Sequence, residues 1–300
     1  MNIVKTTSEL KRTLAPVRGR ERVAFVPTMG CLHEGHLSLI RKARRLADIV
    51  VVSIYVNPMQ FGADEDLDAY PRTFEQDREL CEREGVNIIF HPDNLYPADG
   101  IKTSLKVDAD DALGNCLCGA ARPGHFDGVV TVVNMLFNIV QPDIALFGEK
   151  DYQQLTIINR MVNDLHVDVE VIGCETLRET DGLAMSSRNR YLSEDDRKRA
   201  LFLQQSLQKI AENAKNGEKN CKNLIKDAKK WLKSKNIDPE YLEIRSATSL
   251  EPLDTLNEAP ARIFIAATIG NARLIDNIAL EHVTDNMING ATENITETLT

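Results

Sequence analysis

Two histidines three residues apart, His33 and His36, occur in the run PTMGCLHEGH at residues 27–36. The run follows an apolar stretch at 22–26 and precedes a helical stripe of apolar residues between 39 and 47. A strand-to-helix turn of this kind offers backbone N–H groups and the positive end of a helix dipole to an anion. A spacing of three residues places both imidazoles on one side of the first helical turn. We therefore expect a phosphate-binding turn with free N–H groups and two imidazoles aimed at the anion.

This arrangement resembles the HxGH signature of nucleotidylyltransferases, in which two histidines stabilise the α-phosphate of ATP while a nucleophile displaces pyrophosphate. Two other interpretations of the motif stay open. One is a zinc site, which needs one or two more ligands at compatible spacing, although no Cys pair or third His lies near in the sequence. The other is a structural pair that only caps the helix.

A second segment with chemical potential is FGEKDYQQ at residues 147–154, which follows an apolar run at 143–147. Lys150 and Gln154 are one helical turn apart and share a face. A lysine at such a turn can neutralise phosphate oxygens as charge builds on a leaving pyrophosphate. A solvated lysine in an ordinary first turn explains the same pattern.

Three polar loops complete the candidate site. The run AMSSRNR at 184–190 pairs hydroxyls with arginine, as a phosphate clamp or as a linker would. The run VNPMQF at 56–61 ends a buried strand with Asn57 and Gln60, whose amides can orient a small polar substrate, although an Asn-Pro turn alone explains Asn57. The run RPGHFDG at 122–128 adds cationic capacity, and a capped helix start is its simpler explanation.

These segments need strands and helices to position them. Apolar runs that read as strands buried on both faces alternate with helical patterns, and lie at 22–26, 49–56, 86–90, 143–147 and 167–172. This alternation predicts an α/β doubly wound parallel sheet, in which ligands bind at the carboxyl ends of strands. Beyond about residue 174 we predict charged helices at 193–214 and 219–234, the first opened by a capping box of Ser193 and Asp196, and short strands at 241–246 and 263–267, in a smaller α+β domain.

The composition restricts the class of protein. With 300 residues, 43% hydrophobic and 27% charged, the chain is long enough for two globular domains. A net charge of −9 argues against a nucleic-acid partner, while a local cationic cluster can still bind a small anion. The six cysteines show no CxxC pair, so we expect them to be reduced. No apolar run approaches the ~18 residues of a membrane span and no leader is recognised, so we expect a cytoplasmic protein without a membrane partner.

Six motifs in order, PTMGCLHEGH, VNPMQF, YPRTFEQD, RPGHFDGVVTVV, FGEKDYQQL and LAMSSRNRYLS, resemble the pantothenate synthetase family, the pantoate:β-alanine ligases. The resemblance extends from near the N-terminus to about Asn277. It implies a Rossmann-type domain over 1–175 and a small C-terminal lid over 176–281. The stretch at 282–300 lies beyond the family pattern, lacks periodicity and is rich in Asn, Thr and Glu, so we expect a flexible tail there. It also implies a homodimer, and a reaction in which pantoate and Mg²⁺-bound ATP give pantoyl adenylate, which β-alanine then converts to pantothenate and AMP.

The resemblance also assigns site residues position by position. His36 as proton donor, His33 and Lys150 would be catalytic. The residues that would contact ATP are Met29, Gly30, Cys31, Leu32, His33, Glu34, Gly35, His36, Gly148, Glu149, Lys150, Asp151, Leu177, Met185, Ser186, Ser187 and Arg188. Gln60 and Gln154 would hold pantoate with support from Asn57, and Gln60 would also lie near β-alanine. Cys31 is interpreted as a small side chain and not as a nucleophile, and the resemblance identifies no Mg²⁺ ligand.

Two alternative functions remain open at this point. One is a nucleotidylyltransferase that stops at nucleotide transfer and shares the HxGH chemistry without the two glutamines. The other is a non-catalytic nucleotide-sensing module or an inactive paralogue, which the presence of both histidines and Lys150 disfavours.

Overall fold

The computed structural model describes residues 1–62, 65, 67–96, 105–109 and 111–280. The tail predicted at 282–300 lies outside the described residues. The described chain forms two compact units, one of residues 1–197 with 270–272 and one of residues 198–269 with 273–280. The lid role and the domain boundary at 175 stay predictions.

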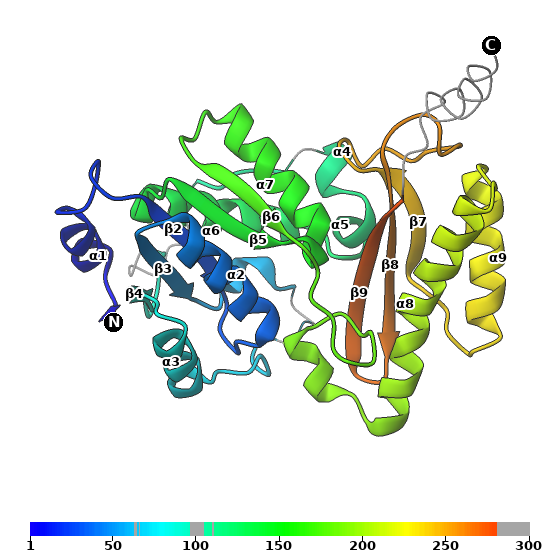
Figure 1. Cartoon of the computed structure of the whole chain (residues 1–300), viewed down its shortest axis with the longest axis horizontal. Coiled ribbons are helices and arrows are strands. Elements are labelled where there is room, and N and C mark those ends of the chain that lie inside the picture. The colour runs from blue at the N-terminus through cyan, green and yellow to red at the C-terminus, as the bar shows by residue number, and fades with distance from the viewer. Residues whose placement is uncertain (63–64, 66, 97–104, 110, 281–300) are drawn as a thin grey trace, which may run out of the picture. The chain divides into compact units, whose positions relative to one another are not determined.

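The first unit is built on a six-stranded parallel sheet with strand order β1-β4-β3-β2-β5-β6 (Figure 1). Its strands are β1 (Asn2–Val4), β2 (Val23–Thr28), β3 (Ile49–Ile54), β4 (Ile88–Phe90), β5 (Ile144–Gly148) and β6 (Glu170–Cys174). Most residues of the central strands are buried, as expected for strands that are covered on both faces. The predicted doubly wound parallel sheet is therefore confirmed, with β1 as an additional strand that the apolar runs did not reveal.

Helices cover both faces of this sheet. On one face α2 (Glu34–Leu46) and α3 (Phe74–Arg83) enclose a core in which Ile40 and Cys81 pack with Val52. On the other face α6 (His125–Val140) packs against β2, with the Phe25 and Phe137 rings 6.4 Å apart, edge to face. Helices α1 (Thr7–Leu14) and α7 (Tyr152–Asp164) pack against α6, and the short helices α4 (Asp111–Gly114) and α5 (Leu117–Ala121) precede it.

The order of the strands creates a switch point between β2 and β5. From β2 the chain proceeds to β3 and β4 on one side, and later to β5 and β6 on the other side. In parallel sheets a crevice forms where the connections diverge, at the carboxyl ends of the two strands. The turn with His33 follows β2, and the turn with Lys150 follows β5. The topology therefore brings together two of the segments singled out in the sequence.

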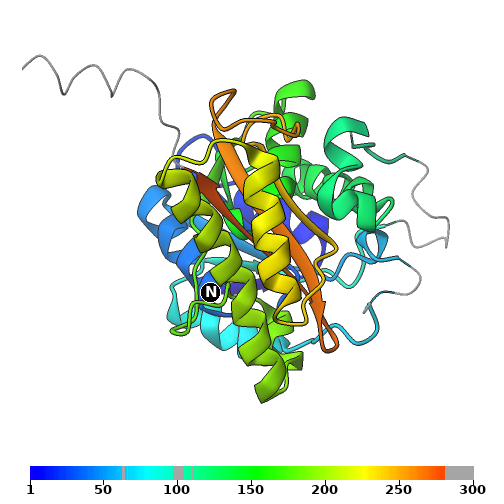
Figure 2. The same ribbon diagram turned by 90° about the vertical axis from the view of Figure 1, so that its right-hand side faces the viewer.

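The second unit combines a three-stranded sheet with two helices. Its strands β7 (Tyr241–Ser246), β8 (Ala261–Ile269) and β9 (Ala272–Leu280) follow in spatial order, and β7 pairs with β8 antiparallel. Helices α8 (Glu194–Lys215) and α9 (Cys221–Lys233) lie side by side across these strands (Figure 2). The N-cap of the predicted capping box is confirmed, because the Ser193 hydroxyl accepts the Asp196 N–H at 3.1 Å. The same hydroxyl donates to the Asp196 carboxylate at 2.8 Å. The smaller α+β domain is thus confirmed in kind, with β9 added.

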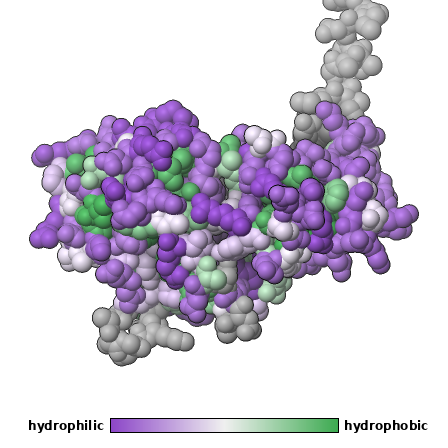
Figure 3. Space-filling view, turned by 90° about the horizontal axis from the view of Figure 1, so that it is seen from below, coloured by the Kyte–Doolittle hydropathy of each residue, from purple (hydrophilic) through white to green (hydrophobic). Residues whose placement is uncertain are grey.

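The surface seen in Figure 3 is predominantly hydrophilic, with small scattered apolar patches. Among the described residues no helix combines the length and the apolar character that crossing a membrane requires.

Candidate active site

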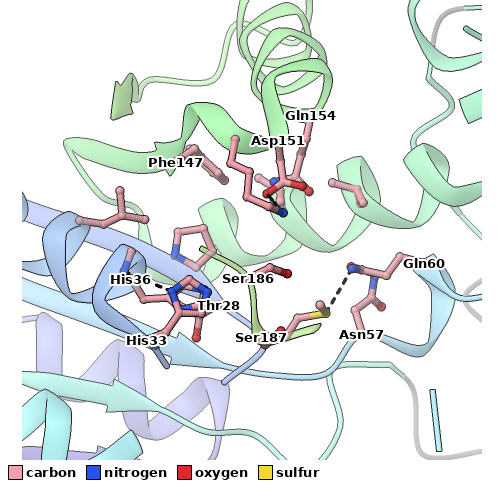
Figure 4. Close-up of a pocket in the computed structure, with 18 of the residues that line it drawn as sticks. Thr28, His33, His36, Asn57, Gln60, Phe147, Asp151, Gln154, Ser186 and Ser187 are labelled. Atoms are coloured by element: carbon pink, nitrogen blue, oxygen red, sulfur yellow. Dashed lines mark hydrogen bonds and ion pairs between the residues drawn. The ribbon is translucent and has the colours of Figure 1, made fainter. Parts of the chain in front are cut away.

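A cavity of about 260 Å³ opens within the first unit at the carboxyl ends of β2 and β5. Figure 4 shows His33 and His36 on one side of it, Asn57 and Gln60 on the other, and Asp151 with Gln154 above them. The structure thus brings together residues from five segments of the chain. The predicted site residues that line the cavity are Met29, His33, Gly35, His36, Asn57, Gln60, Gly148, Lys150, Asp151, Gln154, Leu177, Met185, Ser186, Ser187 and Arg188.

The two histidines cap α2, each through the Nδ1 nitrogen of its own ring. Nδ1 of His33 accepts the Gly35 N–H at 3.2 Å, and Nδ1 of His36 accepts the His33 N–H at 3.3 Å. The histidines therefore do cap the helix, and this capping is compatible with a chemical role as well. Because a neutral imidazole carries one proton, a ring whose Nδ1 accepts must carry its proton on Nε2. Each ring therefore has an Nε2–H donor, and both rings line the cavity, with their centroids 4.1 Å apart.

Burial keeps both rings neutral. Desolvation is the largest cause that lowers the pKa of His36 to about 3, and the neighbouring His33 and Lys150 lower it further. The pKa of His33 is lowered to about 4, again mainly by burial and then by Lys150 and Arg190. At neutral pH these histidines are hydrogen-bond donors without charge, and the positive charge beside them comes from lysine.

Much of the backbone in the turn before α2 is already hydrogen-bonded, so the expectation of free N–H groups is wrong for residues 30–32. The carboxylate of Asp77 accepts the N–H of Cys31 at 2.9 Å and that of Leu32 at 2.7 Å. The N–H of Gly30 goes to the Thr28 hydroxyl at 3.1 Å. The N–H groups of residues 30–32 are therefore bonded inside the protein, whereas the two imidazoles line the cavity.

Five residues assigned to ATP by the resemblance do not line the cavity. Gly30, Cys31 and Leu32 form the buried turn that Asp77 holds. Glu34 forms an ion pair with Arg41 on the outer side of α2. Glu149, in the 3₁₀ turn Glu149–Asp151, likewise does not line the cavity. Contact of these residues with ATP stays a prediction.

Asn57 lines the cavity but makes its hydrogen bonds within the protein. Its Nδ2 donates to Oε1 of Gln60 at 3.1 Å and to the Gly128 carbonyl at 3.0 Å. Its Oδ1 accepts the Met59 N–H at 3.2 Å and the Tyr96 hydroxyl at 2.5 Å. These bonds use both donors and both lone pairs of the amide. Asn57 therefore orients its neighbours, as the sequence analysis expected of a supporting residue.

Gln60 consequently turns its amide nitrogen into the cavity. Because Oε1 faces Asn57, Nε2 is directed to the other side, where it lies 3.2 Å from the sulfur of Met29 (Figure 4). The turn that carries Gln60, Pro58–Gln60, lies close against α6: a Cβ on Gly128 would come within 2.3 Å of the Met59 carbonyl oxygen. Glycine at 128 thus permits the approach that sets Gln60 at the cavity wall.

Arg122 and His125, from the run noted for its cationic capacity, also line the cavity beside Gln60, although the resemblance gave neither residue a role. Nη1 of Arg122 donates to Nε2 of His125 at 2.9 Å, and Nδ1–H of His125 donates to the Gln60 carbonyl at 2.7 Å. Glu65 forms an ion pair with Arg122, in which Nε of Arg122 donates to Oε1 of Glu65 at 2.7 Å. The pKa of His125 is lowered to about 4, mainly by burial and secondarily by the charge of Arg122. The helix start expected here is correct, and its polar side chains wall the cavity as well.

Lys150 and Gln154 reach the cavity from the segment after β5. Both line it, which confirms that they share a face. Nζ of Lys150 lies 3.9 Å from the carboxylate of Asp151, which also lines the cavity. Lys150 thus supplies a cation close enough to the imidazoles to lower the pKa of both.

The segment with the two serines is a hydrogen-bonded hairpin. The Met185 N–H donates to the Leu177 carbonyl at 3.0 Å, which closes the hairpin. The buried Asn189 donates to the carboxylate of Glu179 at 2.7 Å and to the Ala184 carbonyl at 3.1 Å. Ser186 caps the 3₁₀ turn Ser187–Tyr191 by accepting the Arg188 N–H at 3.3 Å. This bonding directs the hydroxyls of the predicted phosphate clamp to the cavity wall.

A zinc ion has no set of ligands in the described part of the chain, where no group of three His, Cys, Asp or Glu side chains could hold a metal. All six cysteines lie in the described part of the chain, where they are buried and form no disulfide, and Cys31 is 1% exposed.

Fold and site together define a doubly wound α/β enzyme with a cavity at its switch point, where two neutral imidazoles, a lysine and two glutamine amides converge. A family model described as pantoate-beta-alanine ligase matches residues 2–279. The chain belongs to the pantoate-beta-alanine ligase family.

Individual relatives agree with this membership over nearly the whole chain. A pantothenate synthetase from Pseudomonas putida strain KT2440 is 49% identical over 93% of this chain and 98% of its own length. One from Thermotoga petrophila is 50% identical over 93% of this chain and its entire length. Among solved structures, pantothenate synthetase from Thermus thermophilus matches with a TM-score of 0.86 at 44% identity, over 93% of this chain and 99% of that one.

A further solved relative carries ligands. It is a pantoate-beta-alanine ligase from Francisella tularensis complexed with beta-gamma ATP and beta-alanine. It matches with a TM-score of 0.76 at 33% identity, over 93% of this chain and 97% of that one.

Proposed function

We propose that the protein joins (R)-pantoate to β-alanine with the use of ATP, giving pantothenate, AMP and pyrophosphate through a pantoyl adenylate. The observation that carries the proposal is the cavity itself, where Nε2–H donors of a histidine pair and a lysine face two glutamine amides. This pattern separates a phosphate-binding side from a side suited to a small hydroxy acid. The complex of the Francisella relative with beta-gamma ATP and beta-alanine supports ATP and β-alanine as substrates.

In the first step a carboxylate oxygen of pantoate attacks the α-phosphorus of ATP, and the bond from that phosphorus to the pyrophosphate oxygen breaks. Negative charge grows on the oxygens around phosphorus and on the leaving pyrophosphate. Donors fixed in advance at such a place lower the barrier because they need no reorganisation. The Nε2–H groups of His33 and His36 would act on the phosphate oxygens, and Lys150 would act on the pyrophosphate.

His36 is better suited to donating a hydrogen bond than a proton. A pKa near 3 leaves very little imidazolium at neutral pH, and the neutral ring holds its Nε2 proton firmly. The resemblance names His36 as a proton donor. The geometry instead favours a neutral His36 that donates a hydrogen bond and keeps its Nε2 proton throughout the reaction. The reaction balances without proton transfer in the first step, because the attacking carboxylate and the leaving pyrophosphate are both anions.

Pantoate would lie between Gln60 and Gln154, with Nε2 of Gln60 as a donor whose direction Asn57 fixes. In the second step the free amine of β-alanine, entering near Gln60, attacks the acyl carbon, and the bond to the AMP oxygen breaks as the amine loses a proton. No covalent enzyme intermediate is needed, and the buried Cys31 is placed as a structural side chain. Met185, Ser186, Ser187 and Arg188, with Leu177, would close over ATP.

The chemistry of the cavity wall also fits Mg²⁺ bound with ATP. Magnesium keeps several waters and binds through one or two carboxylates together with substrate phosphates. Asp151 lines the cavity beside Lys150, and its half-exposed carboxylate suits contact with a hydrated ion. When bound, the ion would neutralise charge on the triphosphate.

Two further assignments belong to the proposal. We infer a cytoplasmic location because none of the six cysteines forms a disulfide, as is typical of a reducing compartment. A homodimer follows from the resemblance to the family alone.

The test is AMP formation measured with ATP and Mg²⁺ in four mixtures: no addition, pantoate, β-alanine, or both. We expect sustained AMP formation only with both, and pyrophosphate exchange into ATP with pantoate alone. Exchange without any use of β-alanine would favour a nucleotidylyltransferase that stops at nucleotide transfer. ATP binding without either reaction would favour a non-catalytic nucleotide-binding module.

A further inference from the structure

Asp77 is a buried carboxylate on α3 that contacts the turn before α2, the turn that leads into His33. It lies in the first turn of α3 and is 1% exposed. Its two oxygens accept the N–H groups of Cys31 and Leu32, the residues immediately before His33. The hydroxyl of Thr73 lies 3.3 Å from both oxygens. In the described part of the chain no lysine or arginine forms an ion pair with it.

A carboxylate without a cation is costly to bury, so its hydrogen-bond partners must compensate for the lost hydration. The turn makes this possible because Gly30 and Cys31 both have positive φ, +82° and +50°, which directs two successive N–H groups to one anion. A positive φ is strained for cysteine and persists only where surrounding contacts enforce it. The two charge-assisted hydrogen bonds of Asp77 are such contacts.

The turn is shaped to admit this carboxylate. A Cβ on Gly30 would meet Oδ2 of Asp77 at 2.9 Å and Ile54 at 3.0 Å, so only glycine leaves room for it. The chain leaves the turn directly into His33, whose N–H and Nδ1 form the cap described above. Displacing Asp77 therefore releases the residues from which the capped histidine pair begins.

We propose that Asp77 is the positioning residue of the histidine pair, acting as an internal anion that occupies the backbone donors of the turn and leaves the imidazole Nε2–H groups as the donors for substrate phosphate. The catalytic part of this inference rests on the proposed function. Asp77 touches no substrate in this account, and its effect on the reaction passes through His33 and His36.

Asp77→Asn tests the proposal with the smallest change of shape. The amide keeps one acceptor oxygen but turns an NH₂ group toward a backbone N–H, so one hydrogen bond is lost and two donors face each other. Because a displacement of about 1 Å can cost on the order of a hundredfold in rate, we expect pantoate-dependent AMP formation to fall by roughly tenfold to a hundredfold. Thr73→Val, which removes the weaker hydroxyl contact, gives a milder version if Asp77→Asn folds poorly.

Asp143→Asn is the control, since Oδ2 of Asp143 also accepts a backbone N–H, that of Val23 at 2.6 Å, at the opposite end of β2. We expect this variant to keep the wild-type rate. The decisive comparison repeats Asp77→Asn and Thr73→Val in a His36→Ala background. If Asp77 acts through the histidines, its substitution adds little further loss there, because contacting residues that work as a unit are not additive. An equal fold-change in both backgrounds would overturn the proposal.

A measurement without substrate separates this inference from the proposed function. In ¹⁵N NMR of the histidine rings we expect the wild type and Asp143→Asn to show the Nε2–H tautomer for His33 and His36. We expect Asp77→Asn, or Thr73→Val to a smaller extent, to shift these signals toward exchange between tautomers. Unchanged ring signals in a folded Asp77→Asn protein would contradict the inference, even if the wild type makes pantothenate as proposed.

Discussion

Asn57 donates a hydrogen bond to Oε1 of Gln60 at 3.1 Å and thereby fixes which end of the Gln60 amide enters the cavity. Behind Asn57, the Tyr96 hydroxyl donates to Oδ1 at 2.5 Å, so a chain of three side chains ends at the substrate side. The hydroxyl of Tyr96 stays protonated, because burial raises its pKa well above the usual range. The polarity of the cavity near Gln60 is thus set from inside the protein.

Tyr96→Phe should weaken the binding of pantoate without preventing the reaction. The ring remains, and the loss of one hydrogen bond worth about 1 kcal/mol leaves Asn57 freer to turn. We expect the KM for pantoate to rise about fivefold with a smaller change in kcat, measured by steady-state AMP formation. Tyr241→Phe removes the hydroxyl of a tyrosine that does not line the cavity and should leave the KM unchanged. An unchanged KM in Tyr96→Phe would show that Gln60 is oriented by other contacts.

His36→Ala should lower the rate while leaving the fold intact. Removing one donor that acts on developing charge costs on the order of 3 kcal/mol, or about a hundredfold in rate. We expect kcat to fall by that factor while the circular dichroism spectrum is retained. His166→Asn is the control, since His166 is exposed, and asparagine tolerates its φ of +51°. Near-normal turnover by His36→Ala would refute the role given to the pair.

Lys150→Ala should harm adenylate formation more than the second step. The lysine charge is needed most while pyrophosphate leaves, and that leaving group has gone when β-alanine attacks. The two steps are separated by supplying synthetic pantoyl adenylate and following pantothenate formation. Lys215→Ala, at the exposed end of α8, serves as the control for loss of a lysine. An equal loss in both steps would contradict the assignment.

The low pKa values of three cavity histidines predict a pH dependence of stability. His33, His36 and His125 have pKa values of about 4, 3 and 4 in the folded protein, against 6.5 when unfolded. Below pH 6.5 the unfolded chain therefore binds protons that the folded protein excludes. The free energy of unfolding must then decrease as the pH falls from about 6.5 toward 4, and these groups give no slope above that window.

Denaturant titrations from pH 4 to 8 test this slope. We expect His36→Gln to reduce it but not to abolish it, because His33 and His125 still contribute. Proton NMR titration of the imidazoles gives an independent check. A midpoint at or above 6.5 for His33 or His36 would contradict the neutral-donor account.

The central strands could be predicted from the sequence because burial on both faces leaves an uninterrupted apolar run. β1 was not predicted because it is only three residues long and two of these, Asn2 and Ile3, are exposed. β9 escaped because Arg273, Asp276 and Asn277 interrupt its apolar pattern. Aspartate and asparagine are rare in strands, and at these positions neighbouring strands, which no local pattern reveals, determine the structure.

The cavity residues could be predicted where a motif lies at a strand end, as for His36, Lys150 and Gln60. Asp77 and Tyr96 were not predicted, because their roles depend on hydrogen-bond partners that are distant in the sequence. These partners lie 46 residues from Asp77 and 39 residues from Tyr96. The expectation of free N–H groups before α2 failed for the same reason. Nothing in the local sequence shows that a carboxylate from α3 accepts their hydrogen bonds. Spacing identified many of the residues that line the cavity, and only the fold revealed the residues that hold them in place.

The most direct test of the account is a crystal structure with a non-hydrolysable ATP analogue and pantoate. We expect Nε2 of both His33 and His36 within about 3.2 Å of oxygens on the α-phosphate, with each Nδ1 still accepting its backbone N–H. Rings turned away from the triphosphate, or an α-phosphate held by the backbone N–H groups of residues 30–32, would contradict it.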